Sequence, residues 1–171
     1  MNAKTKSAFQ YGAALLLLLF ATFFLAWFRA LDTKPILSLE GMEFRIPEGK
    51  KAEIKGKTTV VYFWATWCGV CTTNLPLVKW YASLLKERSG FRFLSVEEGE
   101  NPVALNEYIR KKSIDFPVIP GNPILLRDWN IGGYPSFYIL DGNGNVRFAE
   151  SGIMSPLGIF LRLLWAKIFW P

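Results

Sequence analysis

The sequence predicts an α/β fold with a mixed sheet flanked by helices, together with one N-terminal transmembrane helix. Three observations lead to this prediction. Between residues 58 and 131, strand patterns alternate with helical patterns, as they do in α/β domains. Near the C-terminus, two strand patterns flank the turn sequence DGNGN, which predicts a β-hairpin and therefore antiparallel neighbours in the sheet. Ahead of both lies a long apolar run at residues 8–28, and 171 residues leave room for one domain beside it.

The apolar run at residues 8–28 carries no charged side chain and predicts a membrane anchor. As a helix it would extend about 31 Å, which matches the hydrocarbon core of a bilayer. A cleaved signal peptide is the alternative, but its apolar core is about 7–15 residues long and small residues follow it. Here the run is longer, and its end is bulky and aromatic at Phe23, Phe24, Trp27 and Phe28.

We therefore expect a membrane anchor over residues 1–30, a linker over residues 31–36 and one folded domain over residues 37–171. Basic residues before and after the apolar run are nearly balanced in number, so the positive-inside bias is slight. Long C-terminal domains cross the membrane largely regardless of that bias. The favoured topology is a single pass with the folded domain outside the cytoplasm.

The folded domain begins with short alternating runs at residues 35–57, which look like a hairpin or a peripheral strand pair. TTVVYFWA, residues 58–65, predicts a buried strand. Its residues are mostly β-branched or aromatic, and after Thr59 polar residues do not alternate with apolar ones. Residues 68–88 have helical apolar spacing, and Pro76 would bend that helix. We then expect a strand at residues 90–98, a helix at 101–113 and a short extended piece at 116–122. One or two helical turns at 123–131, the hairpin at 135–151 and a final helix at 157–170 should follow.

The final helix, residues 157–170, is more apolar than one buried face requires. It is too short to span a bilayer. Two interpretations stay open. The helix either packs deeply on the sheet, or its outer face contacts a membrane surface or a membrane partner with Trp165 and Trp170 at the interface.

Composition excludes several function classes. The chain contains no histidine, so it lacks the usual neutral-pH general base, the Ser/His/Asp and Cys/His triads and most catalytic zinc sites. The net charge is +6, but no basic cluster exceeds Arg110, Lys111 and Lys112, which fit the polar end of a helix. Nucleic-acid binding needs a more concentrated patch, so we expect no nucleic-acid partner.

The two cysteines, Cys68 and Cys71, lie two residues apart where the first strand enters a helix. At a helix N-terminus, unpaired N–H groups and the helix dipole stabilise a thiolate at Cys68. Cys71 lies one turn on, close enough to form a disulfide and to release a disulfide-linked partner. This spacing favours redox exchange, with Cys68 as the accessible nucleophile and Cys71 as the buried resolving thiol.

Other roles for the two thiols have weaker support. A structural disulfide across so small a loop would remove little entropy from the unfolded state. A zinc site needs about four ligands, and the sequence has no further cysteine and no histidine. A two-thiolate Cu(I) site stays open, because soft thiolates favour that ion.

Two stretches resemble the thioredoxin superfamily. VVYFWATWCGVC, residues 60–71, is similar to its active-site strand and turn, and WNIGGYPSFYILDGNG, residues 129–144, is similar to its segment with a cis-proline. Between them, residues 91–119 resemble the insertion of the membrane-anchored TlpA-like branch. With the anchor and the Gly-Val dipeptide, the nearest resemblance is to the copper-sensitivity members of that branch. The resemblance covers about residues 37–165.

The resemblance implies a protein-disulfide oxidoreductase with Cys68 as the attacking thiol and Cys71 as the resolving thiol of a redox disulfide. Trp67 would shield the site, and Tyr134 and Pro135, joined by a cis peptide bond, would bind an extended substrate segment. It implies no cofactor and no metal. The partners would be cysteine-containing periplasmic proteins and a membrane electron donor. The setting would be the bacterial inner membrane with the domain in the periplasm, and a link to copper or oxidative stress.

Two residues depart from the resemblance. Thioredoxins usually place a buried Asp six residues before the first cysteine, and the TlpA-like branch often places a Glu three residues after the second. This chain has Tyr62 and Asn74 at those positions. A buried thiol without a neighbouring base keeps a high pKa, so we expect Cys71 to deprotonate slowly. The Gly69-Val70 dipeptide supplies no cation beside Cys68, which predicts a moderately reducing couple.

Overall fold

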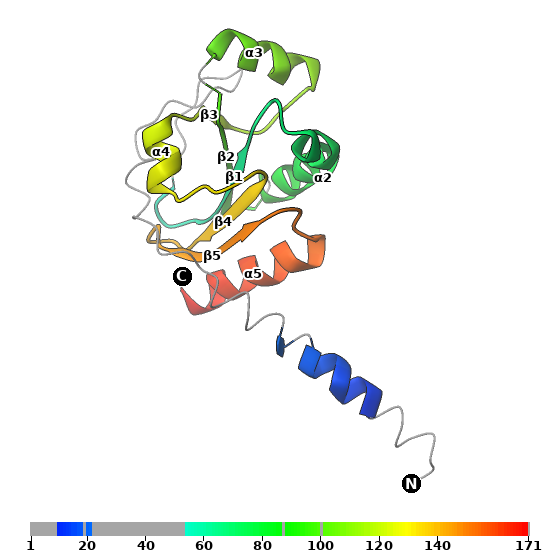
Figure 1. The fold of residues 1–171 in the computed structure, drawn as a ribbon. Coiled ribbons are helices and arrows are strands. Elements are labelled where there is room, and N and C mark those ends of the chain that lie inside the picture. The colour runs from blue at the N-terminus through cyan, green and yellow to red at the C-terminus, as the bar shows by residue number, and fades with distance from the viewer. Residues whose placement is uncertain (1–9, 19, 22–53, 87, 100, 171) are drawn as a thin grey trace.

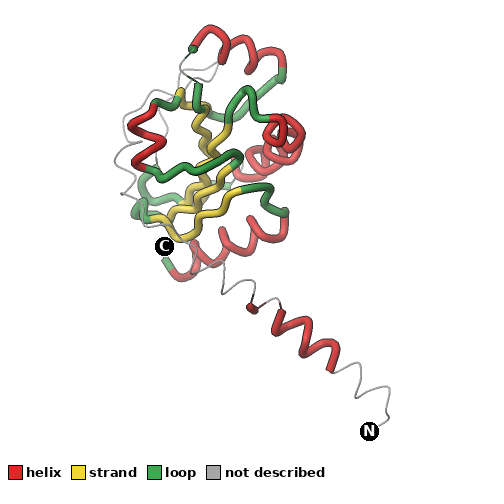
Figure 2. Tube along the Cα trace, in the orientation of Figure 1, coloured by secondary structure: helices red, strands yellow, loops and turns green. Residues whose placement is uncertain are grey.

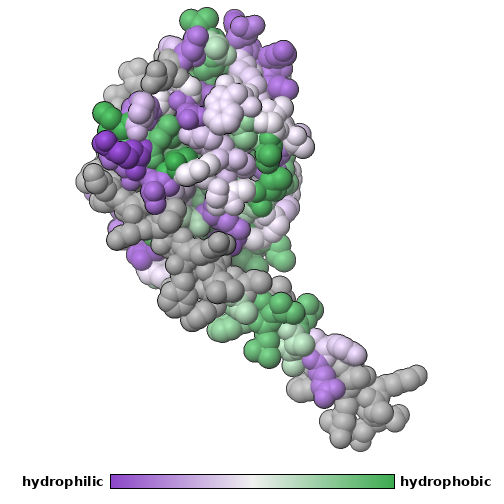
Figure 3. Space-filling view, viewed as in Figure 1, coloured by the Kyte–Doolittle hydropathy of each residue, from purple (hydrophilic) through white to green (hydrophobic). Residues whose placement is uncertain are grey.

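The computed structural model describes residues 10–18, 20–21, 54–86, 88–99 and 101–170 (Figures 1 and 2). The expected strand pair at residues 35–57 and both domain boundaries, near residues 30 and 36, lie almost wholly outside these ranges. Of the expected anchor, residues 10–18 and 20–21 are described, and they are helical. Apart from Gln10, these residues are not polar in their side chains, and most of them are exposed (Figure 3). Within the described ranges, no helix reaches the length and apolarity that crossing a membrane requires.

A five-stranded mixed sheet forms the centre of the domain, in the order β3-β2-β1-β4-β5. β1 pairs in parallel with β2, which pairs in parallel with β3, while β4 is antiparallel to both β1 and β5. The strands β1 to β5 span Thr58–Trp64, Phe91–Glu97, Val118–Pro120, Ser136–Leu140 and Val146–Ser151. The helices α2 to α5 span Gly69–Lys86, Pro102–Lys111, Pro123–Asp128 and Pro156–Phe169. These elements confirm the predicted α/β class with a mixed sheet flanked by helices, and the predicted order from residue 58 onward; the transmembrane helix stays a prediction.

β1 shows why the sheet is covered on both faces. All seven of its residues are buried, and successive side chains point to opposite faces. Val60, Tyr62 and Trp64 join an apolar cluster with residues of α2, α3 and α5, whereas Val61 and Phe63 join a second cluster with α4. Figure 1 shows α2 and α4 on opposite sides of the sheet. The strand therefore has no polar alternation because neither face meets water.

Polar caps precede three of the helices, which begin within one residue of their predicted starts. Asn101 accepts hydrogen bonds from the N–H groups of Val103 and Ala104, and Asn122 accepts one from Leu125. Ser155 accepts one from Gly158. Each cap is followed by a proline at the first helical turn, where a missing N–H costs nothing.

α5 packs on the sheet through one face and leaves the other uncovered. Its buried residues are Ile159, Leu163 and Ala166, which follow helical spacing. The predicted apolar surplus lies on the outer face, where the exposed side chains are Leu157, Phe160, Leu161, Leu164, Ile168 and Phe169. Deep packing of one face is therefore confirmed, and membrane contact of the outer face stays a prediction.

The turn between β4 and β5 is organised by Asp141, which is fully buried. Its carboxylate accepts the backbone N–H groups of Asn143 at 2.8 Å and Asn145 at 2.9 Å, and it pairs with Arg147 at 2.7 Å. Burial alone would raise the pKa of Asp141, but the hydrogen bonds from Asn145, Arg147 and Asn143 outweigh it and lower the pKa below its ordinary value of 3.8. The carboxylate therefore stabilises the fold only while it is ionised.

A lowered pKa at Asp141 predicts acid sensitivity. Its contribution is fully present above pH 3.8 and is lost as the pH falls through the lower folded-state pKa. Asp141→Asn should lower the free energy of unfolding by about 2–3 kcal/mol at pH 7, because Arg147 loses its charged partner. Urea melts of both proteins between pH 7 and pH 2 test this. The difference between them should shrink at the acid end, and parallel curves would contradict the assigned role.

Candidate active site

The two cysteines are joined at the N-terminus of α2. Cys68 immediately precedes the helix and Cys71 lies in its first turn, with an Sγ–Sγ distance of 2.12 Å and a Cα–Cα distance of 5.2 Å. The backbone N–H of Cys71 donates to the Cys68 Sγ at 3.1 Å. After reduction the same donor and the helix dipole would stabilise a thiolate at Cys68, as the sequence predicts.

The exposure of the pair differs from the expectation in one respect. Cys71 is 2% exposed, as expected for a resolving thiol, but Cys68 is only 6% exposed and is also buried. The reason is that the disulfide holds the Cys68 sulfur against the first turn of α2, within the apolar cluster of that face. The prediction that Cys68 is openly accessible is therefore wrong for the oxidised form.

Contact between Trp67 and Tyr134 joins the cysteine segment to the cis-proline segment. Trp67 precedes Cys68 and is 72% exposed, and its ring meets the Tyr134 ring edge-on at 5.8 Å. The Tyr134–Pro135 peptide bond is cis, as predicted. The Pro135 carbonyl already accepts a hydrogen bond from Gly152 at 2.7 Å, whereas no backbone hydrogen bond among the described residues uses Tyr134. The Tyr134 backbone is therefore available to pair with an extended peptide.

Tyr62 and Asn74 occupy the two positions at which the resemblance leads us to expect acids, and both are buried. Among the residues that the structure describes, the Tyr62 hydroxyl and the Asn74 side-chain nitrogen have no hydrogen-bond partner. Burial, and secondarily the nearby Tyr108, raises the pKa of Tyr62 above its ordinary value of 10.0. At neutral pH the phenol stays protonated and cannot act as a base toward Cys71, and an amide cannot either.

Glu97 is a site residue that the sequence analysis missed. It ends β2 beside Trp64 of β1, is 1% exposed, and accepts the backbone N–H groups of Thr66 at 3.1 Å and Gly99 at 2.9 Å. Thr66 lies two residues before Cys68, so the Glu97 carboxylate holds the loop that carries the nucleophile. The available signal was two adjacent acids at the carboxyl end of a parallel strand, where sites on α/β sheets are formed.

Glu98 adds a second carboxylate, close to Tyr134. Its backbone N–H donates to the Trp64 carbonyl at 2.9 Å. Its Oε2 atom is buried and has no hydrogen-bond partner within the described part of the chain. Burial first, and then the nearby Glu98 carboxylate, raises the pKa of Tyr134 above its ordinary value of 10.0. Tyr134 therefore stays a neutral hydroxyl with an acidic neighbour.

The surroundings of the cysteine pair bear on which further side chains could help to hold a metal ion. In the part of the chain that the structure describes, no three His, Cys, Asp or Glu side chains are grouped so that they could hold a metal ion. Cu(I) binding by two thiolates would require reduction of the disulfide first.

The strand order, a Cys-x-x-Cys pair at the start of α2 and a cis-proline segment whose Tyr134 meets Trp67 define a thioredoxin-like protein. Comparison with protein families gives the particular group, because residues 36–149 match the AhpC/TSA family. The match covers well over half of the chain, and the chain belongs to this family.

Individual relatives agree with this assignment. The chain is 27% identical over 121 residues to thiol-disulfide oxidoreductase ResA of Geobacillus kaustophilus, a match that covers 70% of this chain and 66% of ResA. It is 32% identical over 114 residues to thioredoxin-like protein YneN of Bacillus subtilis, covering 63% of this chain and 65% of YneN. The chain thus spans about two thirds of the length of these relatives.

A solved structure supports the fold. The thioredoxin family thiol:disulfide interchange protein of Chlorobium tepidum superposes with a TM-score of 0.60 at 26% identity, covering 80% of this chain and 99% of that one. The names of these similar proteins describe thiol–disulfide exchange.

Proposed function

We propose that this chain is a membrane-tethered thiol–disulfide oxidoreductase that reduces disulfides of periplasmic proteins through its Cys-Gly-Val-Cys pair. The observation that carries the proposal is the Cys68–Cys71 disulfide at a helix N-terminus, with Trp67 in contact with the Tyr134–Pro135 platform. The similar proteins named as oxidoreductases support the same activity.

The reaction has two exchange steps. The reduced Cys68 thiolate attacks one sulfur of a substrate disulfide, forms a mixed disulfide and expels the other substrate sulfur as a thiolate. Cys71 then loses its proton and attacks the Cys68 Sγ, which releases the second substrate thiolate and closes the Cys68–Cys71 disulfide. The substrate gains two electrons and two protons, and a membrane dithiol donor restores the pair by the reverse exchange. Tyr134 positions the extended substrate segment, and Trp67 shields the sulfurs from water.

The membrane and copper parts of the proposal rest on the sequence. The apolar run at residues 8–28 supports an inner-membrane anchor with the domain in the periplasm. A chain whose two cysteines are both in the active pair suits an oxidising compartment. The resemblance to protein D of the bacterial suppressor for copper sensitivity system supports a role in copper or oxidative stress tolerance.

Insulin reduction tests the activity. The full chain in catalytic amount, with dithiothreitol as the stoichiometric reductant, should accelerate insulin precipitation. Its equilibrium with glutathione should give a potential below about −200 mV, well under the oxidising periplasmic enzymes. A tethered Cu(I)-binding module using the same two thiolates would instead bind one Cu(I) per reduced pair and leave the insulin rate unchanged. That second pattern would overturn the proposal.

The absence of a base at residue 74 predicts slow resolution of mixed disulfides. Asn74→Glu should accelerate attack by Cys71 on the mixed disulfide by about tenfold or more, because a carboxylate can accept the thiol proton. Asn74→Gln is the matched control, since it adds the same length without a base. Stopped-flow measurement of release from a preformed Cys68 mixed disulfide follows the step, and equal rates for wild type and Asn74→Glu would refute the idea.

A further inference from the structure

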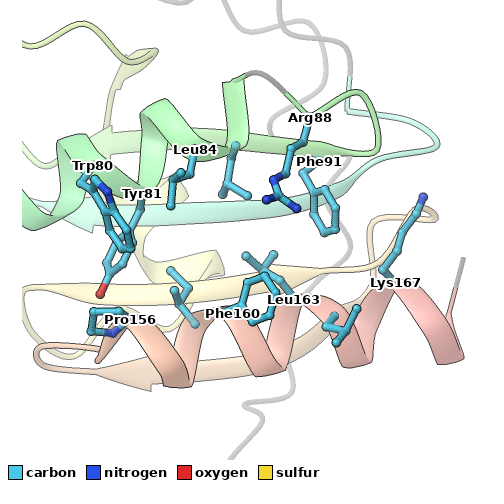
Figure 4. Close-up of a pocket in the computed structure, with 12 residues that line it drawn as sticks. Trp80, Tyr81, Leu84, Arg88, Phe91, Pro156, Phe160, Leu163 and Lys167 are labelled. Carbon is cyan, nitrogen blue, oxygen red and sulfur yellow. The ribbon is translucent and has the colours of Figure 1, made fainter.

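The C-terminal half of α2 and the length of α5 lie side by side and enclose a groove with a volume of about 330 Å³ (Figure 4). That size falls within the range of small-molecule sites, near its lower end. The walls are almost entirely apolar, with Trp80, Leu84, Phe160 and Leu164 at the rim. The nearest wall residue on α2, Trp80, is twelve residues along the chain from Cys68, or about 18 Å along a helix. The groove is separate from the redox site.

Large apolar side chains at the rim are left in water. Trp80 and Phe160 are 49% and 52% exposed, and Leu84 and Leu164 are about as exposed. Removing such surface from water is favourable by about 25 cal/mol per Å². A concave apolar surface of this kind makes more contact with a flexible alkyl chain than with a flat bilayer, because the chain can touch both helices at once.

The two ends of the groove differ in charge. Trp80, Tyr81 and Pro156 lie at one end, and Arg88 and Lys167 lie at the other (Figure 4). The Tyr81 hydroxyl donates to the Met154 carbonyl at 2.7 Å, so the first end presents no unsatisfied polar group from that ring.

Two cations mark the second end. Arg88 points from the α2 side toward α5, and Lys167 rises from α5 (Figure 4). Among the described residues, no carboxylate forms an ion pair with either of them. The Lys167 ammonium lies beside Gly90, where an added Cβ would come within 3.2 Å of Nζ. Two cations at one end of an apolar groove are complementary to an anionic head group with an alkyl tail.

We propose that this groove binds a single-chain anionic amphiphile of the fatty-acid class. The carboxylate pairs with Arg88 and Lys167, and the alkyl chain runs between α2 and α5 so that its methyl end reaches Trp80. The wall on α5 from Lys167 back to Pro156 spans eleven residues, about 16 Å, which accommodates a medium-length chain. This site is independent of the proposed disulfide exchange.

Quenching of Trp80 fluorescence tests both the ligand and its orientation. The full chain is titrated, below the critical micelle concentration, with dodecanoate brominated at its methyl end and with dodecanoate brominated next to the carboxylate. The first should quench saturably and the second much less, because bromine quenches only on contact. The same titration of Trp80→Phe measures the quenching of the other tryptophans, including any near the apolar N-terminal run. Subtracting it from the wild-type titration leaves the quenching of Trp80.

Charge variants test the head-group contact. Arg88→Gln with Lys167→Gln should weaken dodecanoate binding by about tenfold or more. Lys79→Gln is the matched control, because Lys79 also lies on α2 but donates to the Lys112 carbonyl and does not line the groove. It should bind as wild type does. A terminally brominated alkyltrimethylammonium of equal length should bind at least about tenfold more weakly than the carboxylate.

Three results would overturn the proposal. Equal affinity for the anionic and cationic probes, with no effect of the double substitution, would make the groove a non-selective apolar surface. Stronger quenching by the bromine next to the carboxylate would reverse the assigned orientation. Quenching of Trp80 by brominated anionic phospholipid vesicles without saturable dodecanoate binding would make this face a bilayer contact. Near-UV circular dichroism of each variant verifies the fold.

Discussion

Cys68→Ser should abolish disulfide exchange, with a loss on the order of 10³-fold or more, to the uncatalysed background. The substitution replaces only the sulfur that the helix N-terminus and the Cys71 N–H would stabilise as a thiolate. A hydroxyl at this position stays protonated at neutral pH and is a poor nucleophile. Initial rates of insulin reduction measure the effect.

Reduced wild type is the proper reference for Cys68→Ser. Closing a four-residue loop removes entropy from the unfolded chain worth about 2 kcal/mol, so oxidised wild type should be the more stable protein for that reason alone. Thermal melts under reducing conditions should agree closely between the two proteins. A variant that folds equally well and retains more than a tenth of the wild-type rate would remove Cys68 from the role of nucleophile.

Glu97→Ala should lower the free energy of unfolding by about 2–4 kcal/mol and also slow exchange. The two N–H groups that Glu97 accepts, from Thr66 and Gly99, would lose a charged acceptor, and such hydrogen bonds contribute about 1.5–3 kcal/mol each before relaxation and water entry reduce the loss. The loop before Cys68 would then be held less firmly, so alignment of the sulfur for attack should suffer. Urea denaturation and single-turnover rates measure the two effects.

Glu97→Gln is the matched control for that prediction. It keeps the shape and one carbonyl acceptor, so it should recover about half of the stability lost in Glu97→Ala, together with most of the exchange rate. Wild-type stability and rate in Glu97→Ala would mean that the carboxylate does not hold the loop.

The elements of the domain were predictable because their signals are local. The unbroken apolar run of β1, the caps Asn101 and Asn122 with their prolines, and the turn at Asp141 each act within a few residues of sequence. The Cys-x-x-Cys pair at a strand end predicted the helix N-terminus that now donates to Cys68.

Features that depend on distant contacts could not be predicted in the same way. Glu97 matters only because parallel pairing of β1 and β2 sets it beside the loop that leads to Cys68. The low exposure of Cys68 comes from the disulfide and the surrounding cluster, which the spacing of cysteines does not reveal. The groove likewise forms where α2 meets α5, about 70 residues later in the chain.

Trapping with Cys71→Ser in cells tests the central claim most directly. If Cys68 attacks protein disulfides and Cys71 resolves them, the variant should accumulate mixed disulfides on Cys68 that dithiothreitol releases, and mass spectrometry should identify periplasmic proteins as the partners. The same variant carrying Cys68→Ser should trap none. Equal recovery of partners from both variants, or none from either while the reduced wild-type pair binds one Cu(I), would contradict the assignment as a thiol–disulfide oxidoreductase.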